Sequence, residues 1–199
     1  MIEPIDKHAQ RRLHSIERLQ EAALKVLARK NYSAIRVEDI TEQAGMAKGS
    51  LYMYFKSKEE LYIKTINKYF LEQFNRLLDS LLKRRDSKDA LRELVYSTFE
   101  IGSTNQNIEI FYRAVMDKPL LELIHPQLEK LLDSYLDVVK WHFSAIGVKN
   151  PSQRALSMFA LLDGLHLYRF LKLAGNWHWE SARAMERLKS EVLRLLDLE

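Results

Sequence analysis

The sequence predicts an all-helical protein, and two observations support this fold class. Its 199 residues include only six glycines and four prolines, so long stretches contain no strong helix breaker. Between the breakers, apolar residues recur every three or four positions, which is the spacing of one helix face, and no stretch alternates strictly as a half-buried strand does. The chain is long enough to bury a core in one large domain or two small ones.

Composition excludes several classes of protein. A hydrophobic content of 47% with 29% charged residues is typical of a globular chain and not of a disordered one. There is no cysteine, which excludes disulfides, thiolate metal sites and cysteine nucleophiles. The N-terminal stretch lacks the apolar run of a signal peptide, and no apolar segment reaches the roughly 18 residues of a membrane span. We therefore expect a cytoplasmic protein with no membrane association.

The net charge is compatible with a nucleic-acid partner but does not by itself indicate one. The formal net charge is +4, but the first 60 residues carry eleven Lys or Arg against nine Asp or Glu. The placement of the charges, and not their total, has to identify a partner.

The first predicted helix has one apolar face and is expected to end near Asn31, a residue that tolerates a left-handed turn. Before it, Arg11 and Arg12 can form a basic arm that reaches DNA, or a frayed and solvated terminus. The apolar positions of this helix are Ile16, Leu19, Ala23 and Leu27.

Two short amphipathic elements follow, on either side of Gly45. Two short helices joined by a tight turn form a helix-turn-helix, which in DNA-binding proteins places its second helix in the major groove. Their apolar positions are Val37, Ile40 and Ala44 in the first element, and Leu51 and Phe55 in the second.

The residues after this turn suit contact with nucleic acid. Gly49 lets the backbone approach a phosphate, and Lys48 and Ser50 can reach a phosphate or a base edge. Tyr52 and Tyr54 each offer a hydroxyl for a phosphate and a ring for a sugar or a thymine methyl. The alternative is that both tyrosines are partly buried core residues and that the lysines form a solvated face.

A long helix is predicted to begin at Lys58, because Ser57 and Glu60 have the spacing of a capping box. The free N–H groups at its start favour an anion such as phosphate. Further helices are predicted at about 88–101, 107–117, 121–146, 152–174 and 181–198, for a total of about nine.

The run IRVEDITEQAGMAKGSLYMYFKSKEELY, residues 35–62, resembles the DNA-binding domain of the tetracycline-repressor (TetR) family of bacterial regulators. An Ala-Gly turn, a Lys-Gly pair, an aromatic-x-aromatic-Phe run and Ser-Lys-Glu-x-Leu all match in register. The resemblance covers about residues 10–70. It implies a three-helix DNA-binding domain at 1–57 and a helical ligand-binding and dimerisation domain at 58–199. The implied partners are a double-stranded DNA operator, a small-molecule inducer and a second copy of the chain.

The resemblance also implies which residues meet DNA. The recognition helix would be about Lys48–Phe55, Lys58 would hold a phosphate, and Ala47 departs from the family by lacking the usual serine cap. Arg36 stands where the family frequently has Thr. The arginine would add an ion pair to a phosphate. The residues assigned to DNA are Arg36, Val37, Thr41, Lys48, Gly49, Ser50, Tyr52, Tyr54 and Lys58.

The last two predicted helices are amphipathic and can pair across a two-fold axis into a four-helix bundle, or simply cover the core of a monomer. The resemblance favours the homodimer, and with it a palindromic operator. The residues assigned to dimerisation are Leu156, Phe159, Phe170, Met185, Leu188, Val192 and Leu195.

The inducer site is the least specified part of the sequence. Aromatic and polar residues on the middle helices suit a largely apolar or aromatic ligand, although most such residues are ordinary core. Asp163 and His166, three residues apart on one predicted helix, can bind a metal or a ligand, but two residues are a weak signal and a hydrogen-bonded core pair is favoured. No metal and no cofactor are expected. The residues assigned to the ligand are Phe111, Tyr112, Met116, Tyr135, Trp141, Phe159 and His166.

Together these features predict a ligand-responsive repressor of transcription. A TetR-like activator and a ligand-independent DNA-binding protein are the alternatives, which the sequence does not separate from it. An enzyme is not expected, because the histidines are scattered and neither a phosphate loop nor a nucleophile elbow is present.

Overall fold

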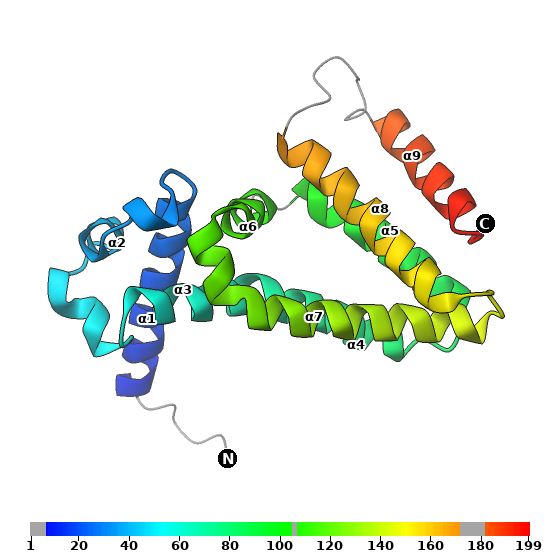
Figure 1. The fold of residues 1–199 in the computed structure, drawn as a ribbon. Coiled ribbons are helices and arrows are strands. Elements are labelled where there is room, and N and C mark those ends of the chain that lie inside the picture. Colours follow the sequence, from blue (N-terminus) through cyan, green and yellow to red (C-terminus); the bar gives the residue numbers. More distant parts are fainter. Residues whose placement is uncertain (1–6, 105–106, 172–181) are drawn as a thin grey trace. The chain divides into compact units, whose positions relative to one another are not determined.

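The computed structural model describes residues 7–104, 107–171 and 182–199, and all regular elements in these ranges are helical, as the sequence predicts (Figure 1). The chain divides into two compact units. The first runs to Phe70 and includes Glu109–Pro126, and the second comprises Leu71–Ile108 and Gln127–Glu199. None of the described helices has the length and apolarity needed to cross a bilayer.

The first unit packs α1 against α2 and α3, the blue to cyan helices of Figure 1. Its core includes fully buried Leu19, Ile40, Leu51 and Tyr62, which lie on four different elements. These elements are α1 (Lys7–Leu27), η1 (Tyr32–Ala34), α2 (Val37–Gln43), η2 (Lys48–Met53) and α3 (Lys58–Ile66).

The ends of α1 correct two expectations. The helix begins at Lys7, so Arg11 and Arg12 lie within its exposed first half and not in an arm before it. It ends at Leu27, and Asn31 is extended, with φ −65° and ψ 145°. Asn31 therefore makes no left-handed turn; it precedes the 3-10 turn η1.

The recognition segment, residues 48–55, forms the 3-10 helix η2 over Lys48–Met53 and not the α-helix predicted over Lys48–Phe55. Ala47, at the capping position, provides no side-chain hydrogen bond, which leaves the short segment without an N-terminal cap. The backbone closes i to i+3 bonds at both ends, from Ser50 N to Ala47 O and from Tyr54 N to Leu51 O.

The helix predicted to begin at Lys58 does so, and it continues through a π-helical turn, η3 (Asn67–Leu71), into α4 (Glu72–Leu82). Ser57 Oγ accepts a hydrogen bond from Glu60 N at 3.2 Å. The Glu60 carboxylate binds Lys56 N, so only half of the predicted capping box is present.

The later helices agree with the sequence prediction in order and nearly in length. They are α5 (Ser87–Thr104), α6 (Asn107–Met116), α7 (Lys118–Ala145), α8 (Pro151–Leu171) and α9 (Ala182–Leu195). The core of the second unit is apolar and includes Leu91, Phe143, Met158 and Val192. Within this unit α5 contacts α4, α8 and α9. Pro126 lies inside α7, at the residue where that helix leaves the first unit.

Candidate nucleic-acid interface

The recognition segment has buried apolar residues on one side and exposed side chains on the other. Leu51 and Phe55 are 0% and 3% exposed, which fixes the segment to the core of the first unit. Tyr52 and Met53 are 61% and 69% exposed. The structure therefore rejects a core role for Tyr52. Met53, which sequence reasoning passed over, reaches the surface because the 3-10 helix turns faster than the expected α-helix.

Lys48 begins this segment and carries its most exposed charge. Its ammonium forms an ion pair of 2.6 Å with Glu38 of α2, and the two side chains are 77% and 38% exposed. The hydrogen bond from Lys48 holds the pKa of Glu38 below its usual value. Sequence reasoning missed this acid, because it stands ten positions before Lys48 and on the other side of the turn.

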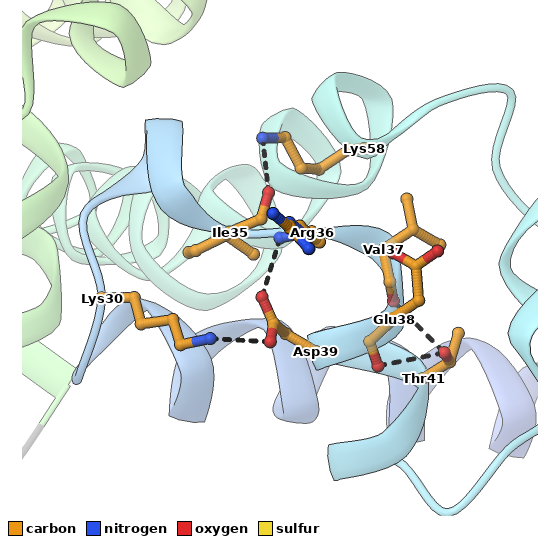
Figure 2. A network of polar contacts seen from close by, with 8 residues as sticks. All are labelled: Lys30, Ile35, Arg36, Val37, Glu38, Asp39, Thr41 and Lys58. Carbon is orange, nitrogen blue, oxygen red and sulfur yellow. Dashed lines mark hydrogen bonds and ion pairs between the residues drawn. The ribbon is translucent and has the colours of Figure 1, made fainter.

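The start of α2 is held by acidic Asp39 (Figure 2). Asp39 Oδ2 accepts a hydrogen bond from Arg36 N at 2.8 Å, and Oδ1 binds Lys30 Nζ at 2.7 Å. The contacts from Lys30 and Arg36 lower the pKa of Asp39 in that order. Because this bond uses only the backbone of Arg36, its exposed side chain is left to face solvent, and Val37 is half-buried beside it.

Thr41, one of the residues predicted to contact DNA, is buried. It is 1% exposed, and its hydroxyl lies 3.2 Å from the carbonyl oxygens of Val37 and Glu38 in its own helix (Figure 2). A buried hydroxyl that is already bonded does not face a phosphate.

Lys58, which is predicted to hold a phosphate, is engaged within the first unit in this structure, and its contact with DNA stays a prediction. Its ammonium donates to the carbonyl oxygens of Tyr32 and Ile35 at 3.1 and 2.9 Å, and it lies 4.1 Å from the centroid of the Tyr32 ring. Figure 2 shows the bond from Lys58 to Ile35. The side chain is half-buried and is directed to these groups of the same unit.

The turn between α2 and the recognition segment depends on α1. Gly45 has φ +62°, a conformation that residues with a side chain rarely adopt. Arg18 donates to the carbonyl oxygens of Ala44 and Gly45 and so holds the turn against α1. The guanidinium of Arg12 lies 5.5 Å from the centroid of the Tyr54 ring, which brings α1 beside the recognition segment.

The residues assigned to a ligand fall into both units. Tyr112 is 5% exposed, whereas Met116 and Trp141 are about half exposed at 51% and 52%. The ring centroids of Tyr135 and Phe159 lie 5.4 Å apart in the second unit. Phe111 belongs to the first unit and half-buried His166 to the second. Among the residues that the structure describes, no cluster of three metal-binding side chains is present.

The residues assigned to dimerisation are divided between surface and core. Leu156 on α8 and Leu195 on α9 are 54% and 57% exposed, whereas Val192 is 1% exposed and belongs to the core of the second unit. The structure therefore places Val192 in the core of this unit, and its role in dimerisation stays a prediction. Phe159, Met185 and Leu188 are half-buried, and the side chain of Phe170 lies outside the described residues.

Comparison with known proteins identifies a common motif. Residues 19–65 match the model described as bacterial regulatory proteins, tetR family. The fatty acid metabolism regulator protein of Bacillus subtilis (strain 168) is 26% identical over 119 residues, which are 60% of this chain and 61% of that protein. An uncharacterized helix-turn-helix transcriptional regulator of the same strain is 34% identical over 80 residues, which are 40% of this chain and 28% of that protein. The chain thus covers less than two thirds of the length of either relative.

Solved structures share the fold over most of the chain. The transcriptional regulator FadR from Bacillus subtilis, in complex with stearoyl-CoA, has a TM-score of 0.69 at 20% identity and matches 90% of this chain and 96% of its own. The fatty acid degradation regulator FadR from Bacillus halodurans has a TM-score of 0.66 at 20% identity over 92% of this chain and 94% of its own. The match over residues 19–65 identifies a DNA-binding domain of the TetR family of bacterial regulatory proteins, and the solved structures show the same all-helical fold over most of the chain.

Proposed function

We propose that the protein is a transcriptional repressor that binds a palindromic DNA operator as a homodimer and releases it when a small ligand binds. One observation carries the DNA-binding part. The recognition segment is anchored by buried Leu51 and Phe55 and presents Lys48, Tyr52 and Met53 to solvent. A cation, a phenol and an apolar group match phosphate, sugar and thymine methyl respectively.

The proposed interface differs from the one expected from sequence. It keeps Arg36, Val37, Lys48, Gly49, Ser50, Tyr52 and Tyr54, gains Arg12 and Met53, and leaves out the side chains of Thr41 and Lys58. Arg12 joins it because its guanidinium lies over the ring of Tyr54. We expect Arg12 to bind a backbone phosphate beside the groove that the segment enters.

Gly49 gives independent support for close approach of a partner. Its φ is not positive, and a Cβ placed on it would meet no atom within 4 Å. Neither the fold of this unit nor its packing requires a glycine there. An external surface that approaches the backbone, such as a phosphate, supplies a reason for the missing side chain.

The homodimer is proposed to form on α8 and α9. Leu156 and Tyr168 on α8 and Leu195 on α9 are more than half exposed. Burial of large apolar side chains between two copies is the usual driving force for association. Two recognition segments related by a two-fold axis would read half-sites about 34–36 Å apart.

The ligand is proposed to bind in the second unit beside α7. The Tyr135 hydroxyl and the Gln127 side-chain oxygen are buried, and in the described part of the chain neither has a hydrogen-bond partner. Both lie on α7, eight residues apart, which is a rise of about 12 Å along the helix. Separate polar groups of a mainly apolar ligand would satisfy them. Stearoyl-CoA is the first probe, because it is bound in the FadR structure from Bacillus subtilis.

Fluorescence anisotropy with the DNA upstream of the protein's own gene tests operator binding. The parent should bind this fragment more tightly than a scrambled one, with a binding constant that falls steeply with salt. Lys48→Ala and Gly49→Ala should each weaken binding about tenfold. Lys140→Ala, which removes an exposed lysine of the second unit, is the matched control and should bind like the parent. Equal binding of the two fragments by the parent would refute the proposed function.

A second titration tests the ligand. Stearoyl-CoA added to the protein–operator complex should release the DNA, and Tyr135→Phe should require more of it for the same release. Release by stearoyl-CoA that is identical in the parent and in Tyr135→Phe would show that the hydroxyl is not part of the site.

A further inference from the structure

Tyr32 lies at a junction in the first unit where two charged side chains meet one residue. It is 5% exposed, and its backbone N–H donates to Asp117 Oδ2 at 2.8 Å. Its carbonyl oxygen accepts a hydrogen bond from Lys58 Nζ at 3.1 Å. Hydrogen bonds to charged partners are roughly twice as strong as those between neutral groups. The backbone on both sides of Tyr32 is therefore held firmly.

Asp117 fixes the starts of two helices with one carboxylate. Its Oδ1 accepts a hydrogen bond from Leu120 N at 3.2 Å, in the first turn of α7. Its Oδ2 binds the first N–H of η1, where the residue before, Asn31, gives no side-chain cap. The corner between α6 and α7 thus supplies the N-terminal cap of η1 that the local sequence lacks.

Lys58 completes the connection to α2. Its ammonium binds the carbonyl oxygen of Ile35 at 2.9 Å, and the next residue, Arg36, is the N-cap of α2 (Figure 2). Contact with the Tyr32 ring, 4.1 Å from its centroid, adds a cation–π attraction. Lys58 of α3 therefore holds the chain that leads into α2 at two points, Tyr32 in η1 and Ile35 just before the N-cap.

We propose that Asp117, Tyr32 and Lys58 form a relay that positions α2 and the recognition segment for the operator. Lys58 is a positioning residue in this relay and not a phosphate ligand. Because Asp117 bonds both Tyr32 N and Leu120 N, operator affinity depends on the position of the turn between α6 and α7. The inference rests on the proposed function for its readout.

The decisive variant is Asp117→Ser. Serine retains an oxygen that caps α7 at Leu120 but is too short to reach Tyr32 N. Operator affinity should fall about tenfold. The substitution removes a negative charge, which by itself would raise affinity for DNA. In variant protein that is folded, a fall therefore indicates lost positioning, and affinity equal to or above that of the parent would overturn the proposal.

Lys58→Met separates positioning from phosphate binding, because methionine keeps the stem over Tyr32 and loses the ammonium. Affinity should fall, while the slope of log affinity against log salt stays that of the parent. A phosphate ligand would instead reduce that slope by about 0.9. Lys48→Ala is the matched control, in which the reduced slope is expected. A reduced slope in Lys58→Met would overturn the assignment.

Coupling between the two ends is measured in the double variant. If Asp117 and Lys58 act through the same residue, Asp117→Ser with Lys58→Met should bind the operator no more than about twofold more weakly than the weaker single variant. The ¹⁵N–¹H resonance of Tyr32 should shift in each single variant, which reports the relay in folded protein without DNA. Independent, multiplicative losses of affinity would overturn the relay. If the parent protein does not bind the operator, the proposed function is refuted instead.

Discussion

The two compact units treat their buried tyrosines in opposite ways. In the first, the fully buried Tyr62 donates its hydroxyl to the carbonyl oxygen of Ala23 at 3.0 Å. In the second, the buried Tyr135 hydroxyl has no partner among the described residues. Burial raises the pKa of both phenols. Tyr62 is therefore held by a directional bond and the Tyr135 hydroxyl by packing alone. Among the described residues, buried polar atoms without a partner are Gln20 Oε1 in the first unit and atoms of Gln127, Tyr135 and His142 in the second.

This difference has a functional meaning. Recognition of base edges requires side chains placed to within a fraction of an ångström, which directional hydrogen bonds provide and apolar contacts do not. A ligand site needs polar groups that are free to bind, and it gains from surroundings that can repack. The contrast predicts that substitutions will act differently in the two units.

The largest effect is expected from emptying the core of the second unit. Phe143 is 0% exposed within the apolar cluster. Phe143→Ala should lower the free energy of unfolding by about 3–5 kcal/mol, because it removes apolar contacts and leaves a cavity. Phe143→Leu, which keeps most of the volume, should lower it by about 1.5 kcal/mol or less. Urea denaturation followed by circular dichroism measures both, and equal losses would contradict a unit held by packing.

Acid should weaken the second unit first. His142 is fully buried with Nδ1 3.0 Å from Ser87 Oγ, and burial lowers its pKa below the usual 6.5. Below pH 6.5 the unfolded chain binds a proton that the folded chain does not bind until its lower pKa is reached. Stability therefore falls as the pH drops through this window, by at most about 1.4 kcal/mol per pH unit.

The first unit should keep its stability to lower pH than the second unit. Contacts from Lys30 and Lys64 hold the pKa values of Asp39 and Glu60 below their usual 3.8 and 4.5, so the stability that these carboxylates add is lost only below those values. Urea denaturation between pH 7.5 and 5 should show a slope in the parent that is absent in His142→Asn. A slope that persists in the variant would assign the titration to another group.

The matched pair of tyrosines gives a smaller effect with opposite signs. Tyr62→Phe should destabilise the protein by about 1 kcal/mol, because a buried hydrogen bond is lost. Tyr135→Phe should be neutral or stabilise the protein by about 1 kcal/mol, because a buried hydroxyl without a partner is removed. Thermal and urea unfolding of both variants measure the difference. Destabilisation by both substitutions would mean that Tyr135 has a partner in the ligand-free protein.

Sequence alone predicted the helices well because their signals are local. Apolar spacing, Gly45 and the Ser57 cap lie within the elements they define. The sequence did not predict contacts between residues far apart in the chain. Lys58 was assigned to phosphate from its place at a helix start, yet its partners Tyr32 and Ile35 lie 26 and 23 residues away.

The site was predicted in the same uneven way. Exposure of Lys48 and Tyr52 followed from motif and spacing, but the motif did not indicate Arg12 or Met53 as surface neighbours. The bond that buries the hydroxyl of Thr41 is local, but a helical pattern does not specify which face the core will cover. The domain boundary at residue 57 and the DNA contacts themselves stay predictions.

The smallest effect on stability is expected where a polar contact in the first unit joins only two side chains. The ion pair between Lys48 and Glu38 lies at the surface, so Glu38→Gln should leave the unfolding free energy nearly unchanged. Its effect on DNA should be larger, because Lys48 is released and a negative charge beside the proposed phosphate contacts disappears. Affinity for unrelated DNA should rise about threefold, and further than in the exposed control Glu42→Gln on the same helix. Equal rises in the two variants would mean that the pair does not restrain Lys48 and that only total charge matters at this surface.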